Sequence, residues 1–332
     1  MSAGTIIIVP TLNEAKHIGA LLDGLLVEAE ALDARIVVAD GGSTDGTTDI
    51  VAQRALQSPR LALIHNPQRI QSAAINLAVQ AFGDGVDYLI RIDAHGAYPT
   101  DYCRTLVAEA EQRQVASVVV PMTTIGIEPF QQAVATAQNS AIGTGGSAHR
   151  TGNASGPVDH GHHALMRIDA FRGVGGYDQN FRVNEDAELD YRLRQAGHTI
   201  WLTDRTGMTY FPRSTAVGLF RQYFNYGGGR ARNILKHRMR PRLRQLAPLA
   251  ILPVALLAAL SLWHWGFLVP LALWGVGCIA LGVHAARQHY PQYGMPMALS
   301  PLVGLAAMIM HLAWSSGFWA HVARAPFQRE TV

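Results

Sequence analysis

Short hydrophobic runs alternate with polar or amphipathic segments over the first 120 residues of this 332-residue chain. The runs are rich in Val, Ile and Leu. Helical spacing of apolar positions predicts helices between them, among others over residues 18–26 and 74–81. The expected fold class is α/β, with a parallel sheet covered by helices and a ligand site at the carboxyl ends of the strands. We predict buried strands at residues 5–9, 35–39, 61–65, 88–92 and 116–120.

The pattern is less regular after residue 120. Residues 143–163 are rich in Gly, Ser and His, and we expect a mobile loop there, which either has a function or is a passive connector. The elements expected after it are a strand at 164–167, the turn GVGGYD, a helix at 184–197, strands near 200 and at 208–211, and an amphipathic helix over 216–244.

Charge divides the chain into two parts of opposite sign. Residues 1–204 carry 14 Lys and Arg against 23 Asp and Glu, whereas residues 205–332 carry 13 Lys and Arg and one acidic residue, Glu330. The 39 residues from 245 to 283 contain no charged side chain. This is the composition of a membrane region, so a simple soluble enzyme is excluded.

Three apolar stretches, 246–263, 267–283 and 299–319, each approach the roughly 20 residues that a helix needs to cross a bilayer. Prolines in or near these stretches leave half-spanning hairpins as an alternative to full spans. The number of spans, and with it the side of the C-terminus, therefore stays open at this point.

A basic segment stands directly before the first apolar stretch, with eight Lys and Arg between Arg221 and Arg244. We expect it to lie on anionic membrane lipids rather than to bind nucleic acid, and to hold the N-terminal part in the cytoplasm. The start of the chain has no signal-peptide features, and Cys103 and Cys278 lie in segments too different for a disulfide framework. The predicted domains are a catalytic domain at 1–213, interfacial helices at 214–244, a membrane region at 245–323 and a tail at 324–332.

Two motifs follow predicted strands. In VVADGGSTDGT, Asp40 ends a strand and is able to accept hydrogen bonds from a nucleotide base or ribose, although a tight turn capped by Ser43 or Asp45 would look the same. In LIRIDAHG, Asp93 and His95 are separated by one residue and are candidate ligands of a divalent cation, with a strand-end cap as the alternative.

A third motif, VNEDAELDYRLRQAG, gathers four carboxylates at the start of a predicted helix. The helix dipole favours acidic residues there and accounts for the cluster without any function. The functional interpretation makes Asp186 a general base that removes a proton from an acceptor hydroxyl.

The order VPTLNE, DGGSTDGT, RIQSAAINLA, RIDAHG, GGYD, NEDAEL and RQYFNYGGGR resembles family 2 glycosyltransferases with a GT-A fold, a Rossmann-like nucleotide-sugar-binding domain. The likeness extends over most of residues 5–235 and is strongest to ExoA-type glucosyltransferases of succinoglycan and related exopolysaccharide assembly. Each motif alone is weak, whereas the ordered set is specific.

The resemblance implies a role for each matching residue. Asp186 corresponds to the general base. Asp93 and His95 occupy the positions of the DxD metal motif, which implies Mn²⁺ or Mg²⁺, although a histidine in place of the second aspartate leaves the metal preference open. The residues implied to bind the nucleotide-sugar are Pro10, Thr11, Asn13, Glu14, Asp40, Arg69, Asn76, Asp93, Arg221, Gln222, Arg230 and Arg232.

The acceptor side of the site is less well marked. Three histidines in four positions are candidates for loop or acceptor contacts rather than for a zinc site, because no cysteine or carboxylate spacing completes one. The candidate acceptor residues are His160, His162, His163, Tyr177, Asp178 and Glu185.

The expected function is that of an inverting, metal-dependent glycosyltransferase of the bacterial inner membrane. It would transfer glucose from UDP-glucose to a polyprenyl-pyrophosphate-linked saccharide at the cytoplasmic face. Two alternatives remain: transfer to polyprenyl phosphate itself, and a non-catalytic, membrane-anchored nucleotide-sugar sensor. A processive synthase is disfavoured, because no QxxRW motif is present and three short apolar stretches offer little material for a channel.

Overall fold

The computed structural model describes residues 4–146, 154–241, 243–293 and 296–325. The chain forms two compact units, one of Met1–Met122 with Gly152–Tyr210 and one of Thr123–Thr151 with Phe211–Val332. Residues 123–146 lie inside the catalytic domain predicted at 1–213, but in the structure they group with the C-terminal helices. The physical reason is the apolar face of a helix in this segment, which is buried against those helices.

The first unit is built on an eight-stranded sheet with the strand order β3-β2-β1-β4-β8-β5-β9-β7. The five predicted strands are present, with ends that differ by at most two residues. Strands β1, β2, β3 and β4 are mutually parallel, as predicted, but β8 is antiparallel to both β4 and β5. The strand bounds are β1 Thr5–Thr11, β2 Arg35–Asp40, β3 Leu61–His65, β4 Tyr88–Arg91, β5 Ser117–Val120, β6 Met122–Thr124, β7 Gly156–Pro157, β8 His162–Arg167, β9 Ile200–Leu202 and β10 Met208–Tyr210.

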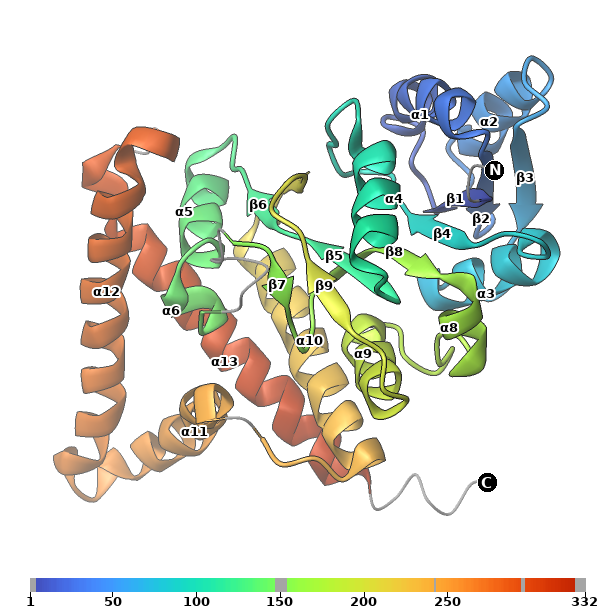
Figure 1. The fold of residues 1–332 in the computed structure, drawn as a ribbon. Coiled ribbons are helices and arrows are strands. Elements are labelled where there is room, and N and C mark those ends of the chain that lie inside the picture. The colour runs from blue at the N-terminus through green and yellow to red at the C-terminus, as the bar shows by residue number, and fades with distance from the viewer. Residues whose placement is uncertain (1–3, 147–153, 242, 294–295, 326–332) are drawn as a thin grey trace. The chain divides into compact units, whose positions relative to one another are not determined.

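Helices cover both faces of this sheet (Figure 1). Because successive side chains of a strand point to opposite faces, Ile7 and Val9 of β1 pack with α1, α2 and α4, whereas Ile6 and Ile8 pack with α3, α8 and α9. Burial on both faces explains why the strands are almost uninterrupted apolar runs. The helix bounds are α1 Ile18–Leu32, α2 Thr47–Ala55, α3 Gln71–Phe82, α4 Tyr102–Arg113, α8 Ile168–Gly173 and α9 Glu185–Gln195.

The direction of β8 decides what lies at the functional edge of the sheet. Parallel strands β1, β2 and β4 bring their carboxyl ends to one edge. Since β8 runs the other way, with Leu165 opposite Ile90, its first residues His162 and His163 lie at this same edge. The expected loop at 143–163 is therefore partly wrong: β7 and the start of β8 fall within it, and residues 147–153 lie outside the described residues.

The second unit is helical. A buried cluster joins Ala133 of α5, Leu219 of α10, Ala286 of α12 and Val303 of α13. The predicted helix over 216–244 is interrupted at Arg238, which has a φ of +50°. The helix bounds are α5 Pro129–Gln138, α6 Ala141–Thr144, α10 Ala216–His237, α11 Leu243–Ala258, α12 Val269–Tyr293 and α13 Pro301–Arg324, with short 3₁₀ turns at Ala259–Leu262, Trp265–Leu268 and Met297–Leu299.

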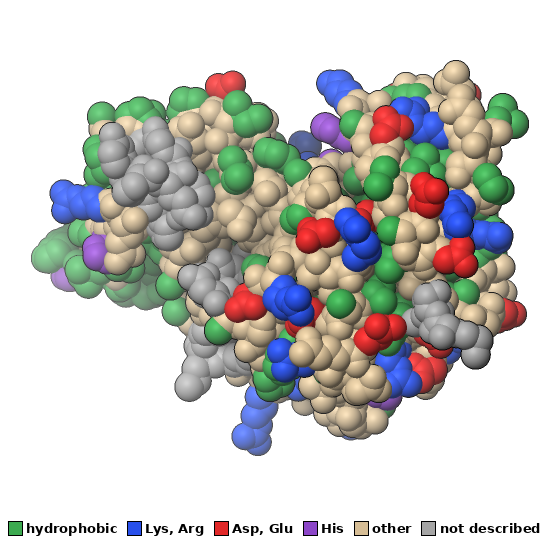
Figure 2. All heavy atoms as spheres, turned by 45° about the horizontal axis from the view of Figure 1, so that its top comes forward, with side chains coloured by type: hydrophobic (Ala, Val, Ile, Leu, Met, Phe, Trp, Pro, Cys, Tyr) green, Lys and Arg blue, Asp and Glu red, His purple; other side chains and the backbone are tan. Residues whose placement is uncertain are grey.

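Within the described residues, three helical segments of the second unit are long and apolar enough to cross a membrane: Gln245–Leu262, Trp265–Gln288 and Met297–Arg324. They overlap the three stretches predicted from the sequence. On the face shown in Figure 2, the charged side chains are concentrated on the first unit, whereas the second unit presents mostly hydrophobic ones. Such a surface is typical of helices that contact lipid.

Candidate active site

The loops that follow β1 and β2 are tied together at the carboxyl edge of the sheet. The Asn13 backbone N–H donates to Ser43 Oγ (2.8 Å), and the Asn13 side-chain oxygen accepts from the Thr44 backbone N–H (2.9 Å). Asn13 has a φ of +59°, which asparagine tolerates better than most residues. With Pro10 and Thr11 at the end of β1, this pair of loops forms the edge at which the sequence predicts the nucleotide pocket.

Asp40, the last residue of β2, is buried and accepts four hydrogen bonds. One oxygen accepts from the backbone N–H groups of Gly42 and Ser43, both at 2.8 Å. The other accepts from the hydroxyls of Thr11 (3.0 Å) and Ser43 (2.6 Å). Burial alone would raise the pKa of Asp40, but these donors outweigh burial and lower the pKa. All four acceptor positions of the carboxylate are engaged, so a base or ribose group would have to replace one of the donors.

Arg69 and Asn76, both expected beside the nucleotide, have different surroundings. Arg69 lies over the turn after β2, where a Cβ added to Gly42 would be 3.4 Å from the guanidinium. Asn76 binds the backbone of Tyr177 twice, since its amide donates to the Tyr177 carbonyl (2.8 Å) and its oxygen accepts from the Tyr177 N–H (2.9 Å). The structure therefore uses Asn76 to hold the GGYD turn in place.

Asp93 and His95 follow β4, as expected, but face different partners. One oxygen of Asp93 accepts from the Gln71 amide, and the other lies 3.8 Å from His162 Nε2. His95 is half exposed, and its Nδ1 lies 3.0 Å from Glu14 Oε1. Glu14 thus enters the site as the partner of His95.

The chemistry of these residues fits a divalent cation that binds together with its substrate. Among residues that the structure describes, no three His, Cys, Asp or Glu side chains are grouped so that they hold a metal ion by themselves. Burial would raise the pKa of Asp93, but Arg91 and His162 outweigh this effect and lower it, so the carboxylate is ionised. Sites with one or two carboxylates typically complete the coordination of Mg²⁺ with substrate phosphates and water.

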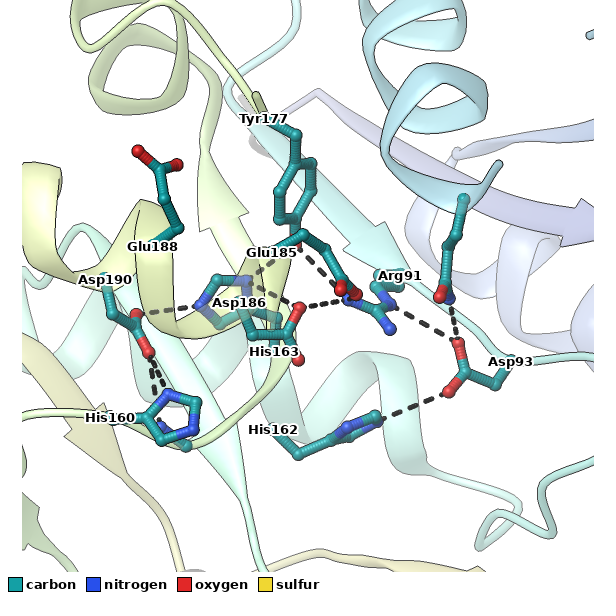
Figure 3. A network of polar contacts seen from close by, with 12 residues as sticks. Arg91, Asp93, His160, His162, His163, Tyr177, Glu185, Asp186, Glu188 and Asp190 are labelled. Carbon is teal, nitrogen blue, oxygen red and sulfur yellow. Dashed lines mark hydrogen bonds and ion pairs between the residues drawn. The ribbon is translucent and has the colours of Figure 1, made fainter. Parts of the chain in front are cut away.

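Arg91, which is not among the residues predicted from the sequence, lies between the carboxylates of Asp93 and Asp186 (Figure 3). Its side chain is only 4% exposed. Its partners are the carboxylates of Asp93 (3.3 Å), Glu185 (3.3 Å) and Asp186. A charged residue inside an apolar strand was the available signal, because a buried arginine almost always has an anionic partner.

Glu185 and Asp186, in the first turn of α9, have opposite pKa shifts. Burial raises the pKa of Glu185 to about 8, and the neighbouring Asp186 carboxylate adds to this effect. Burial acts on Asp186 in the same direction, but Arg91 and the histidines outweigh it and hold its pKa well below the ordinary value. At neutral pH Asp186 is therefore ionised and Glu185 carries a proton.

His160, His162 and His163 all contact carboxylates of the site. His162 and His163 are buried in β8, and burial lowers the pKa of His162 to about 4, so its imidazole is neutral at neutral pH. Figure 3 shows His162 directed towards Asp93, and both His160 and His163 directed towards the carboxylate of Asp190.

The GGYD turn contributes Tyr177 to the site. Tyr177 is buried, and its hydroxyl faces His163 and Arg91. The Asp178 carboxylate accepts a hydrogen bond from the Asn180 backbone N–H (2.8 Å), which stabilises the turn. An acceptor role for either residue stays a prediction.

Arg221, Gln222, Arg230 and Arg232 all lie on α10, in the second unit. Within that unit, the Gln222 amide donates to the Tyr226 hydroxyl (3.1 Å). Their expected contact with the donor stays a prediction.

Comparison with known sequences identifies the family. The family model described as glycosyl transferase family 2 matches residues 6–175. The chain is 54% identical over 318 residues to the succinoglycan biosynthesis protein ExoA of Rhizobium meliloti (strain 1021), with 96% of this chain and 94% of the relative covered. These matches confirm the resemblance inferred from the ordered motifs.

Two solved structures show the same fold at low sequence identity. The mannosyltransferase PcManGT from Pyrobaculum calidifontis, in complex with GDP-Man and Mn²⁺, matches with a TM-score of 0.58 and 20% identity over 93% of this chain and 86% of its own. GalNAc-T7 with UDP, GalNAc and Mn²⁺ matches with a TM-score of 0.50 and 14% identity over 69% of this chain and 48% of its own. The chain belongs to glycosyl transferase family 2, and it is a glycosyltransferase with a GT-A fold.

Proposed function

We propose that this enzyme transfers glucose, with inversion, from UDP-glucose to a hydroxyl of a polyprenyl-pyrophosphate-linked saccharide at the cytoplasmic face of the bacterial inner membrane. In this reaction the acceptor oxygen attacks the anomeric carbon in line as the bond to UDP breaks. A single displacement needs one base and no enzyme nucleophile.

The observation that carries the proposal is the position of the Asp186 carboxylate, which is paired with the buried guanidinium of Arg91. It lies in the first turn of α9, where the helix dipole favours negative charge, and its side chain is 16% exposed. Arg91 fixes the carboxylate in place without supplying a proton to it, because a guanidinium stays protonated. Glu185, which holds its own proton at neutral pH, is the weaker candidate for the base.

On the donor side, Asp40 and the loops after β1 and β2 are the proposed nucleotide edge, with Arg69 beside the diphosphate. Asp93 and His95 are the proposed ligands of a divalent cation, Mn²⁺ or Mg²⁺. Such a cation, when bound, neutralises charge that develops on the departing diphosphate. The Mn²⁺ ions named with the two similar solved structures support this choice.

The acceptor class rests on two observations. The relative that is 54% identical is named for succinoglycan biosynthesis. Three described helices that are long and apolar enough to cross a membrane support an acceptor that is itself linked to a membrane lipid. A phosphate acceptor is already ionised and needs no base, so the ionised Asp186 favours a sugar hydroxyl.

The test is an incubation of the purified full-length protein, in detergent or membranes, with a panel of UDP-sugars and extracted lipid-linked saccharides, followed by mass spectrometry of the lipid products. A mass increase of one hexose with UDP-glucose, lost in the presence of a metal chelator and in Asp186→Asn, is expected. Glucosyl transfer to bare polyprenyl phosphate in place of the saccharide would overturn the acceptor assignment. Hexose transfer from another nucleotide-sugar in place of UDP-glucose would overturn the assignment of the donor.

A further inference from the structure

Asp186 has a second polar neighbour besides Arg91. Figure 3 shows its carboxylate between the guanidinium of Arg91 and the imidazole of His163. His163 Nδ1 lies 3.6 Å from Asp186 Oδ1 and 2.6 Å from the Tyr177 hydroxyl. The side chain of His163 is fully buried, so every polar contact it makes is with the protein.

The far side of the imidazole is held by Asp190. His163 Nε2 lies 2.8 Å from Asp190 Oδ1, while the other oxygen of Asp190 accepts from the Gly161 backbone N–H (3.3 Å) and faces His160 Nδ1 (2.8 Å). The pKa of Asp190 is lowered, because His163 and His160 outweigh the effect of burial, so this carboxylate only accepts. It therefore fixes the proton of a neutral His163 on Nε2, so that Nδ1 is an acceptor, bonded to the Tyr177 hydroxyl, on the side of Asp186.

The helix geometry explains why one imidazole reaches both carboxylates. Asp186 and Asp190 are four residues apart in α9, so they lie on the same face of the helix. His163 of β8 contacts this face, since its Nδ1 lies 3.6 Å from Asp186 Oδ1 and its Nε2 lies 2.8 Å from Asp190 Oδ1. A purely structural role is a weak explanation, because a buried pair of charged groups stabilises a fold no better than well-packed apolar side chains.

We propose that His163, oriented by Asp190, receives the proton that Asp186 removes from the acceptor hydroxyl. This inference rests on the proposed function, in which Asp186 is the base. The O–H bond of the acceptor breaks and its proton moves to an Asp186 oxygen, while the oxygen forms a bond to the anomeric carbon and UDP leaves with the electron pair. The Tyr177 hydroxyl then gives up its hydrogen bond to His163 Nδ1, and the proton moves from Asp186 to Nδ1, which gives an imidazolium paired with Asp190. It returns to solvent through the partly exposed Asp186 after the products leave.

The charges around His163 support the direction of this transfer. Burial lowers the pKa of His163, but the carboxylates of Asp190 and Asp186 on α9 outweigh burial and raise it. Arg91 on β4 opposes them, and the Tyr177 hydroxyl stays neutral because burial raises its pKa well above the ordinary value. Proton transfer from Asp186 to His163 is therefore favourable, because it forms an imidazolium beside the two carboxylates Asp186 and Asp190.

The relay predicts a specific pH dependence. His163 accepts a proton only when it is neutral, so kcat falls as the pH drops below the raised pKa of His163. In His163→Gln the acid limb of the kcat profile should move to lower pH, since only Asp186 then titrates, and the maximal kcat should fall by about 10-fold or more. In Asp190→Asn the imidazole remains but loses its counter-charge, and the limb should shift down by about 1 pH unit or more.

The experiment measures kcat against pH, at saturating donor and acceptor, for the parent, His163→Gln and Asp190→Asn, with His198→Gln as a control histidine outside the network. UDP binding reports whether each variant is folded, and Asp190→Asn decides the matter if His163→Gln does not bind UDP. A lower kcat with an unmoved acid limb in the folded variants would overturn the relay and leave a structural role. Full activity of Asp186→Asn would instead overturn the base on which the relay rests, so the two failures are distinguishable.

Discussion

Glu185 and Asp186 are adjacent in the sequence and contact the same guanidinium of Arg91, yet the pKa of Glu185 is raised and that of Asp186 is lowered. One buried cation faces three carboxylates, counting Asp93, and cannot balance three negative charges. The proton retained by Glu185 removes one of these charges. The site thereby keeps two ionised carboxylates with separate roles, Asp93 on the donor side and Asp186 on the acceptor side.

This difference predicts unequal effects of two isosteric substitutions. Asp186→Asn should retain UDP-sugar binding and lower kcat by about 10²- to 10⁴-fold, the usual contribution of a general base. Glu185→Gln keeps a neutral group of the same shape and should lower kcat far less. Steady-state kinetics with a lipid-linked acceptor measure both. Similar losses in the two variants would contradict the assignment of the base to Asp186.

The raised pKa of Glu185 also predicts how stability depends on pH. The pKa is about 8 in the folded protein and about 4.3 in an unfolded chain, so between these values the folded state binds more protons. Stability therefore falls as the pH rises through this window. Glu185→Gln removes that proton equilibrium, so the stability of the variant should fall less with rising pH. The difference in stability between variant and parent should therefore shift in favour of the variant towards pH 8. Thermal unfolding of both proteins in detergent from pH 5 to 8 measures this, and parallel curves would show that Glu185 is ionised throughout.

Histidine in place of a second aspartate predicts an unusual metal preference. His95→Asp should stay active and shift the preference towards Mg²⁺, because carboxylates favour that cation more than imidazole does. His95→Ala should weaken Mn²⁺ binding in the presence of UDP. Electron paramagnetic resonance of free Mn²⁺ during a titration measures the affinity independently of turnover. Equal Mn²⁺ affinity in the parent and His95→Ala would remove His95 from the metal site.

The basic residues near α10 should fall into two functional groups. Arg230 lies within α10, whereas Arg238 and Arg240 are exposed at and beyond its end, close to the first membrane helix. Replacing Arg238 and Arg240 by Gln should weaken flotation with anionic liposomes, since each charge near such a surface contributes about 1 kcal/mol. UDP affinity in detergent should not change.

Arg230→Gln is the control for the replacement of Arg238 and Arg240. It should raise the KM for the UDP-sugar, because an arginine that binds diphosphate oxygens acts at one site, while flotation with anionic liposomes persists. Arg221 and Arg232 are expected to resemble Arg230 in this assay. Arg242 and Arg244 belong to the same distal group, although Arg242 lies outside the described residues, and neutralising either is expected to act as neutralising Arg238 does. Identical profiles for the two groups would mean that the whole segment is an anchor.

The close contact of α10 with α13 predicts a strong effect of one methyl group. A Cβ added to Gly227 would lie 1.9 Å from the Trp314 carbonyl oxygen, so Gly227→Ala forces the helices apart and should cost about 1 to 3 kcal/mol. A Cβ added to Gly277 of α12 meets nothing within 4 Å, so Gly277→Ala should be neutral or stabilising. The unfolding temperature in detergent should drop only for Gly227→Ala. The reverse order would contradict this helix contact.

The sequence by itself determined the elements whose signal is local. Residues 5–9 became β1 because a continuous apolar run fits a strand that is buried on both faces. The uncharged residues 245–283 gave helices suited to a membrane, because their composition leaves few other environments. The carboxyl-edge positions of Asp40 and Asp93 followed from the alternation of strands and helices, which makes those strands parallel.

Only the tertiary structure decided which distant residues meet. The apolar pattern of β8 is the same for a parallel and for an antiparallel strand, so it does not predict the direction of β8. The burial of His163 beside Asp186 and Asp190 depends on that direction and therefore could not be predicted. Arg91 is paired with carboxylates of α9, which lie nearly one hundred residues later in the chain, so its role could not be predicted from its own segment. The pKa values of the three carboxylates around Arg91 depend on the same long-range assembly, because the carboxylates are buried next to one another only after folding.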